Sequence, residues 1–180
     1  MKKFVACLLF LLTAIVVPAA NADLKEAKPT YELLAEQGFA TAQVALGSMY
    51  AKGEGVPQNY KIAAKWFRLA AEQGNADAQY LLGARYIEGT GVRQDYTIAK
   101  KWLLLAAEQG NAYAQFSLGA MYVNGEGVLQ NYKMAHMYFN ISAANGHDQG
   151  GKFRNRIADL MTTQQIADAQ QMANEWMAKH

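Results

Sequence analysis

Residues 75–110 read NADAQYLLGARYIEGTGVRQDYTIAKKWLLLAAEQG, and this stretch decides the fold because the chain repeats it on either side. Residues 39–74 and 111–146 align with it without a gap, at a period of 36 residues. Most of the shared positions hold Ala, Gly, Tyr, Leu or Gln. Self-similarity at a fixed period of this length is typical of a solenoid of stacked units. We therefore expect three repeats that stack on one another.

Within each repeat the pattern predicts two helices joined by a glycine-rich loop. In the first repeat Ala42, Leu46 and Tyr50 lie at i, i+4 and i+8, on one helix face. Gly53 suits the left-handed C-terminal cap of that helix, and Asn59 is a good N-cap for the next. Glycine inside a helix is unfavourable, so its recurrence predicts close approach of a neighbouring helix at Gly47, Gly83 and Gly119.

The two ends of the chain depart from the repeat. Residues 23–38 resemble the second half of a repeat, and we expect them to form an N-terminal capping helix. We expect residues 147–180 to form C-terminal capping helices. Thr162 and Gln165 have the spacing of a capping box. Caps are expected because the terminal faces of a solenoid meet water. An apolar stripe in the C-terminal segment is formed by Phe153, Ile157, Leu160 and Met161.

Residues 1–22 have the pattern of a secretory signal peptide. Lys2 and Lys3 precede an apolar run of 14 residues, and the small residues Ala20-Asn21-Ala22 follow it. A membrane-spanning helix needs about 20 apolar residues. We predict cleavage after Ala22 and a protein located in the periplasm or outside the cell. The alternative is an uncleaved membrane anchor.

Cleavage would change the charge and the cysteine content. The full chain has 17 basic and 15 acidic residues, so the loss of Lys2 and Lys3 leaves 15 of each. The balanced charge provides no general footprint for nucleic acid or an anionic membrane. Cys7, the single cysteine, also lies in the signal peptide, so the mature chain could form no disulfide.

The sequence contains no motif that predicts catalysis. It has no H-E-x-x-H motif and no phosphate-binding glycine loop ending in Lys-Ser/Thr, so we predict neither enzyme activity nor a cofactor. His147 with Asp148 could form half of a metal site, but His136 is not at the i, i+4 spacing that would complete it. We therefore predict no metal site and expect His147 to be a surface residue at a repeat junction. The equivalent position of the second helix is aromatic in every repeat, as Trp66, Trp102 and Tyr138. This aromatic column could stack on a ligand, but packing between neighbouring helices is the favoured interpretation.

The order A-Q-x-x-L-G-x-x-Y, then G-x-G-V, then A-x-x-W-F-x-x-A-A-E-Q-G resembles the Sel1-like repeat, a relative of the tetratricopeptide repeat. The resemblance covers residues 39–146. It implies an all-α, right-handed α-solenoid of helix-turn-helix pairs, with the first helix of each pair on the concave side. It also implies a non-catalytic scaffold for protein–protein interaction. Two alternatives are β-lactam binding or hydrolysis, as in cysteine-rich secreted relatives, and recognition of cell-wall glycan or peptide.

A candidate binding face follows from the positions that vary between repeats. Shared positions serve the structure common to every unit, so an individual function is expected at varying positions on one helix face. On the first helix these positions become aromatic and apolar towards the third repeat, which is typical of an interaction surface. The alternative is that these side chains pack helices together. The candidates for binding a protein or peptide partner are Tyr80, Ala84, Ile87, Tyr113, Phe116 and Val123.

Overall fold

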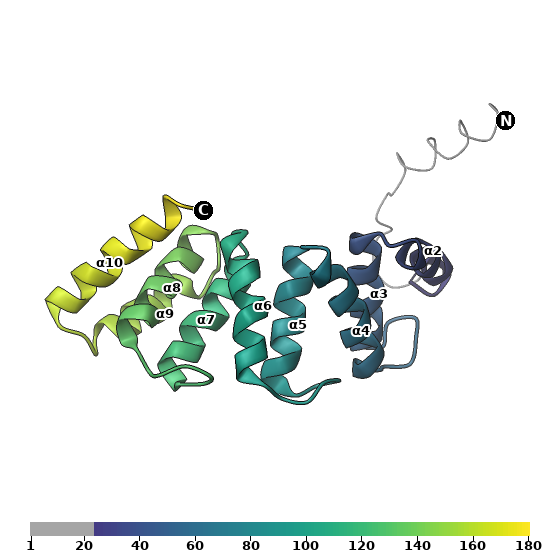
Figure 1. The fold of residues 1–180 in the computed structure, drawn as a ribbon, viewed down its shortest axis with the longest axis horizontal. Helices are drawn as coiled ribbons and strands as arrows, with labels where there is room; N and C mark the ends of the chain where they lie inside the picture. Colours follow the sequence, from purple (N-terminus) through teal and green to yellow (C-terminus); the bar gives the residue numbers. More distant parts are fainter. Residues whose placement is uncertain (1–23) are drawn as a thin grey trace, which may run out of the picture.

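The computed structural model describes residues 24–180, which form a row of α-helices without a strand in that range. The expected signal peptide, residues 1–22, lies outside the described residues. Figure 1 shows the helices following one another along the long axis, from α2 at one end to α10 at the other. This arrangement confirms the all-α solenoid. The helices are α2 (Leu24–Glu36), α3 (Ala40–Lys52), α4 (Tyr60–Glu72), α5 (Ala76–Glu88), α6 (Tyr96–Glu108), α7 (Ala112–Asn124), α8 (Tyr132–Ala144), α9 (Gly150–Ala158) and α10 (Thr163–Met177).

The predicted caps define the helix ends. Asn59 accepts a hydrogen bond from the Ile62 amide at 3.1 Å, and Asp95 and Asn131 cap α6 and α8 in the same way. Gly53 has a φ of 76°, in the left-handed region, and its amide donates to the Met49 carbonyl. The first repeat has one exception, because Phe39 stands at the N-cap of α3 without a side-chain hydrogen bond.

Each helix-interior glycine contacts the second helix of its own repeat. A Cβ on Gly47 would lie 2.6 Å from Phe67, and one on Gly119 would lie 2.7 Å from Phe139. At Gly83 the corresponding neighbour is Leu103, at 2.9 Å. These separations are too short for two carbon atoms, so the helices pack this closely only because the side chain is missing. The predicted close approach is confirmed.

Buried glutamines join each repeat to the one before it. The Gln115 side chain is fully buried, and its Nε2 donates to the Ala107 carbonyl of α6 at 3.0 Å. Its Oε1 accepts from Asn145 Nδ2, at the end of α8, at 2.9 Å. Gln43 and Gln79 make the equivalent pairs of bonds. Each of these amides therefore links three helices, which is how a buried polar group is accommodated in an apolar core.

The C-terminal helix α10 folds back against α8 and covers the last repeat. Ala169 and Ala173 are fully buried in this contact, and Ala173 joins a cluster that includes Leu103 and Ile141. Ile141 is buried, whereas the equivalent Leu105 of the second repeat, which α10 does not reach, is exposed. Helix α10 thus acts as the cap that a solenoid needs.

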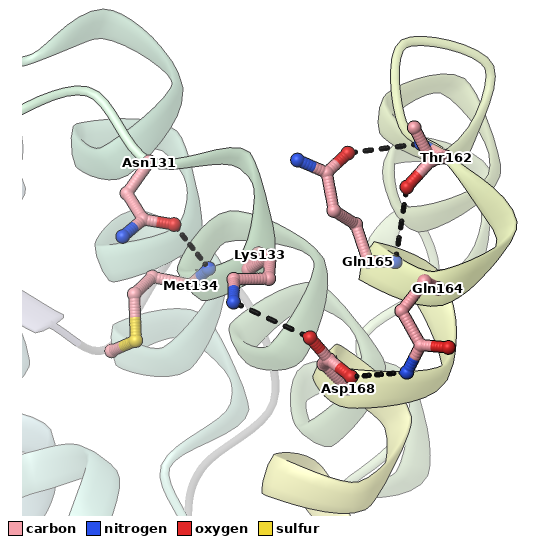
Figure 2. A network of polar contacts seen from close by, with 7 residues as sticks. All are labelled: Asn131, Lys133, Met134, Thr162, Gln164, Gln165 and Asp168. Carbon is pink, nitrogen blue, oxygen red and sulfur yellow. Dashed lines mark hydrogen bonds and ion pairs between the residues drawn. The ribbon is translucent and has the colours of Figure 1, made fainter.

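Polar contacts fix the start of α10. Figure 2 shows the predicted capping box, in which Thr162 Oγ1 accepts from the Gln165 amide and Gln165 Oε1 accepts from the Thr162 amide. Next to it Lys133 of α8 lies 3.4 Å from Asp168. One expectation for this region was wrong: Leu160 is not part of the apolar stripe, because it lies past the end of α9 and is 61% exposed.

Candidate partner-binding face

Five aromatic rings form a continuous row across the last part of the solenoid. The ring centroids of Tyr80 and Tyr113 are 5.6 Å apart, and those of Tyr113 and His147 are 5.0 Å apart. His147 stacks on Phe116 at 4.2 Å, and Phe116 meets the edge of Phe153 at 5.0 Å. Three of these separations lie within the usual range of favourable aromatic pairs, and the stacked rings of His147 and Phe116 are slightly closer. We refer to these five residues as the aromatic row.

The row combines residues from three helices and one turn. Tyr80 lies on α5, while Tyr113 and Phe116 lie three residues apart on α7, on the same face. His147 lies in the turn after α8, where its Nδ1 accepts from the Gln149 amide at 3.2 Å. Phe153 belongs to α9. Stacking of successive repeats therefore brings together side chains that are far apart in the sequence.

The members of the row differ in how much solvent they meet. Tyr113 is 59% exposed and Phe153 is 37% exposed, whereas Tyr80, Phe116 and His147 are half-buried. Phe116 also packs against the fully buried Phe139, with ring centroids 5.1 Å apart. Tyr113 is thus the ring most available to a partner, and Phe116 supports the row from the core.

The other sequence candidates lie beside the row or beneath it. Ala84 and Ile87 follow Tyr80 on α5 and are half-buried. Ile87 packs against the apolar clusters on both sides of its helix, and Val123 packs against the cluster that holds Phe139. For Ile87 and Val123 the packing interpretation therefore fits the contacts that we observe.

The environment of Tyr80 and of His147 favours the neutral form of each ring. Burial raises the pKa of Tyr80, and the neighbouring Tyr113 raises it further. Burial lowers the pKa of His147 from its ordinary value of 6.5, and Asp148 opposes this shift only in part. The phenol and the imidazole are accordingly both neutral at pH 7. An uncharged aromatic surface suits apolar contact with a partner.

Sequence reasoning missed His147 and Phe153 as members of the face. His147 was expected to be a surface residue at a repeat junction, but it is half-buried between Tyr113 and Phe116. The sequence contains one indication of this position of His147. It follows Asn111 by one repeat period and so stands where a fourth unit would begin. No group of three metal-binding side chains occurs in residues 24–180.

The aromatic column of the second helices lies in or beside the core. Tyr138 is buried and stacks with Tyr122 at 5.7 Å between ring centroids. Trp66 and Trp102 are half-buried and pack against the apolar clusters of their repeats. These contacts fit the packing role that the sequence favoured for the column. Among the described helices none is long and apolar enough to cross a bilayer.

Comparison with known families gives three consecutive matches. The family model of the Sel1 repeat matches residues 40–75, 76–111 and 112–147. No curated protein sequence matched the chain.

Solved structures with a similar fold include a protective antigen of uropathogenic Escherichia coli strains that displays an SLR fold. It is 36% identical, with a TM-score of 0.82, over 87% of this chain and 33% of that one. A Sel1 repeat protein from Oxalobacter formigenes is 37% identical, with a TM-score of 0.66, over 70% of this chain and 50% of that one. The chain thus spans about a third and a half of their lengths. Helicobacter pylori cysteine-rich protein B is 21% identical over 74% of this chain and 96% of that one, with a TM-score of 0.57, and shares the fold.

Proposed function

The chain belongs to the Sel1 repeat family, whose members generally serve as protein-interaction modules, and from this premise we propose that it is a non-catalytic scaffold that binds a protein or peptide partner. The partner contacts the aromatic row, on the face formed by α5, α7 and α9. Binding takes place in the periplasm or outside the cell, after cleavage behind Ala22. The N-terminal pattern of residues 1–22 supports this location.

The observation that carries the proposal is the exposure of Tyr113 within the aromatic row. A tyrosine that is 59% exposed while its ring contacts Tyr80 and His147 presents a large, pre-positioned apolar surface to solvent. Rigid aromatic side chains lose little conformational entropy on binding and are enriched among the residues that dominate binding energies. The half-buried Tyr80 and His147 on either side of Tyr113 hold this surface in place.

One of the similar solved structures gives the exported location a second line of support. The Escherichia coli protein with the SLR fold is a protective antigen, and it is 36% identical to this chain. We infer from this likeness and from the N-terminal pattern that the present chain functions outside the cytoplasm.

The test begins with capture of the partner on the exported protein from an envelope extract of the producing cells, with identification by mass spectrometry. The Tyr113→Ala variant is then compared with wild type by calorimetry. We expect it to weaken binding by about 1–2 kcal/mol. Its melting temperature should hardly change, because exposed substitutions usually alter stability by less than about 0.5 kcal/mol.

The matched control is Leu129→Ala, which removes an apolar side chain that is 91% exposed in the loop before α8. This variant should retain both stability and binding. A folded Tyr113→Ala variant that binds the captured partner as tightly as wild type would refute the proposed face. Retention on cell-wall glycan in place of a protein would instead favour the glycan alternative.

A further inference from the structure

A second surface, formed by α4 and the loop that precedes α6, carries a concentration of positive charge. Three adjoining hollows of about 580, 430 and 530 Å³ lie between α4 and the loop that precedes α6, and Val92 lines all three. Lys61 and Arg68 each line two of these hollows, Arg93 lines two, and Lys65 lines one. We refer to these four cations around Val92 as the basic groove.

In the part of the chain that the structure describes, the cations of the basic groove form no ion pair with an acidic side chain. None of the ion pairs within residues 24–180 includes one of the four. Asp95 is the single carboxylate in the lining, and its Oδ1 already accepts from the Ile98 amide at 2.9 Å as the N-cap of α6. Four cations against this one carboxylate leave the lining with a net positive charge, although the 17 basic and 15 acidic residues of the full chain nearly balance.

One of these cations is held in a fixed position. Arg68 Nη2 donates to the hydroxyl of the buried Tyr86 at 2.6 Å, which leaves its other N–H groups free to bind. Lys61, Lys65 and Arg68 lie at i, i+4 and i+7 on one face of α4. At 1.5 Å per residue they span about 10 Å. The same span is covered by three or four residues of an extended peptide, whose alternate side chains lie on one side.

The second junction between repeats lacks this surface. At the positions one period later, three of the four cations are replaced by uncharged residues, which are Thr97, Leu104 and Leu129. Only Lys65 has a basic counterpart, Lys101. The glycine and valine of the loop recur as Gly127 and Val128. The scaffold is thus common to both junctions, whereas the charges are specific to the first. A requirement of the fold would not produce this difference.

From these observations we infer that the basic groove binds an acidic segment of a partner protein in an extended conformation. Carboxylates at alternate positions lie on one side of the extended segment and meet the side chains of Lys61, Lys65 and Arg68. An acidic peptide fits better than a polyanion that has no apolar side chains, because the floor of the groove includes the apolar Ala64 and Val92. Four clustered cations are few for nucleic acid, which is bound by wide basic surfaces.

The test uses the full exported protein and the fluorescent peptide Gly-Glu-Val-Glu-Val-Glu-Gly, beside its counterpart with glutamine in place of glutamate. We expect the acidic peptide to bind at least about tenfold more tightly than the neutral one at low salt, and the difference to shrink as salt is added. The double variant Lys61→Glu/Lys65→Glu should weaken acidic-peptide binding by at least about tenfold. Both lysines are exposed on α4, so the variant should fold as wild type does.

The matched control is Lys100→Glu/Lys101→Glu, which makes the same change in net charge on α6. Peptide binding should be nearly unchanged in this variant. Equal losses in the two double variants, or equal binding of the two peptides, would overturn the inference. Binding of phosphatidylglycerol vesicles but not of the peptide, abolished by Lys61→Glu/Lys65→Glu, would also overturn it in favour of a lipid surface. These variants leave the aromatic row intact, so the two proposals fail or succeed separately.

Discussion

Replacement of Phe139 by alanine is expected to lower the free energy of unfolding by about 3–5 kcal/mol. Phe139 is fully buried in α8, and its ring lies 5.1 Å from that of Phe116 and 5.5 Å from that of Phe153. It also fills the space that the missing side chain of Gly119 leaves open. One ring therefore joins α7, α8 and α9, and its removal leaves a cavity where three helices meet.

Urea unfolding followed by circular dichroism measures this loss. The control is again Leu129→Ala, because its exposed side chain should contribute less than about 0.5 kcal/mol. Since each helix packs mainly against its neighbours in the row, hydrogen exchange should accelerate most in α7, α8 and α9. A loss of less than about 1 kcal/mol would contradict the packing described for this core.

Introduction of a carboxylate into the C-terminal cap is expected to have a comparably large effect. Ala173 of α10 is fully buried against the cluster that contains Leu103 and Ile141. The Ala173→Asp variant either buries a charge without a partner or forces α10 away from α8. An uncompensated buried charge costs about 3–5 kcal/mol in proteins, and we expect a loss of this size.

The neighbouring Asn174→Asp variant provides the matched control, because Asn174 is exposed on the same helix. It adds the same charge at nearly the same height of α10 and should leave the melting temperature within a few degrees of wild type. Limited proteolysis should release α10 from the Ala173→Asp variant only. If both variants melt like wild type, α10 is not the cap of the last repeat.

The fold was predictable because the repeat presents every local signal three times. Gly53, Asn59 and the helix-interior glycines each have one conformational reason to be where they are, and the structure confirms those reasons. The capping box of Thr162 and Gln165 depends on four consecutive residues, so it too could be predicted. Local chemistry of this kind does not require knowledge of long-range contacts.

The candidate face was only partly predictable, because its outer members come from a segment without the repeat. Beyond His147 the pattern of the repeat is lost, and Gly150 lies so close to α8 that a Cβ there would be 2.6 Å from the Ala143 nitrogen. This tight contact places α9 where Phe153 reaches Phe116. No periodicity in the sequence indicates such a contact. The packing of Phe116 on Phe139 was likewise not predictable from the sequence, because it depends on how α7 packs against α8.

The basic groove was missed for a different reason. The total charge is nearly balanced, with 17 basic and 15 acidic residues, and this balance gave no indication of a local cluster. The spacing of Lys61, Lys65 and Arg68 on one helix face was visible in the sequence. The contribution of Arg93 was not, because it depends on the loop folding back over α4.

Hydroxyl-radical footprinting of Tyr113, with and without the captured partner, tests most directly whether the aromatic row is the binding face. In the free protein this ring should be oxidised readily, because it is 59% exposed. Bound partner should reduce its oxidation several-fold, to roughly the level of a buried ring, while Leu129 stays as reactive as before. Equal oxidation of Tyr113 in the free protein and in the complex would contradict the account.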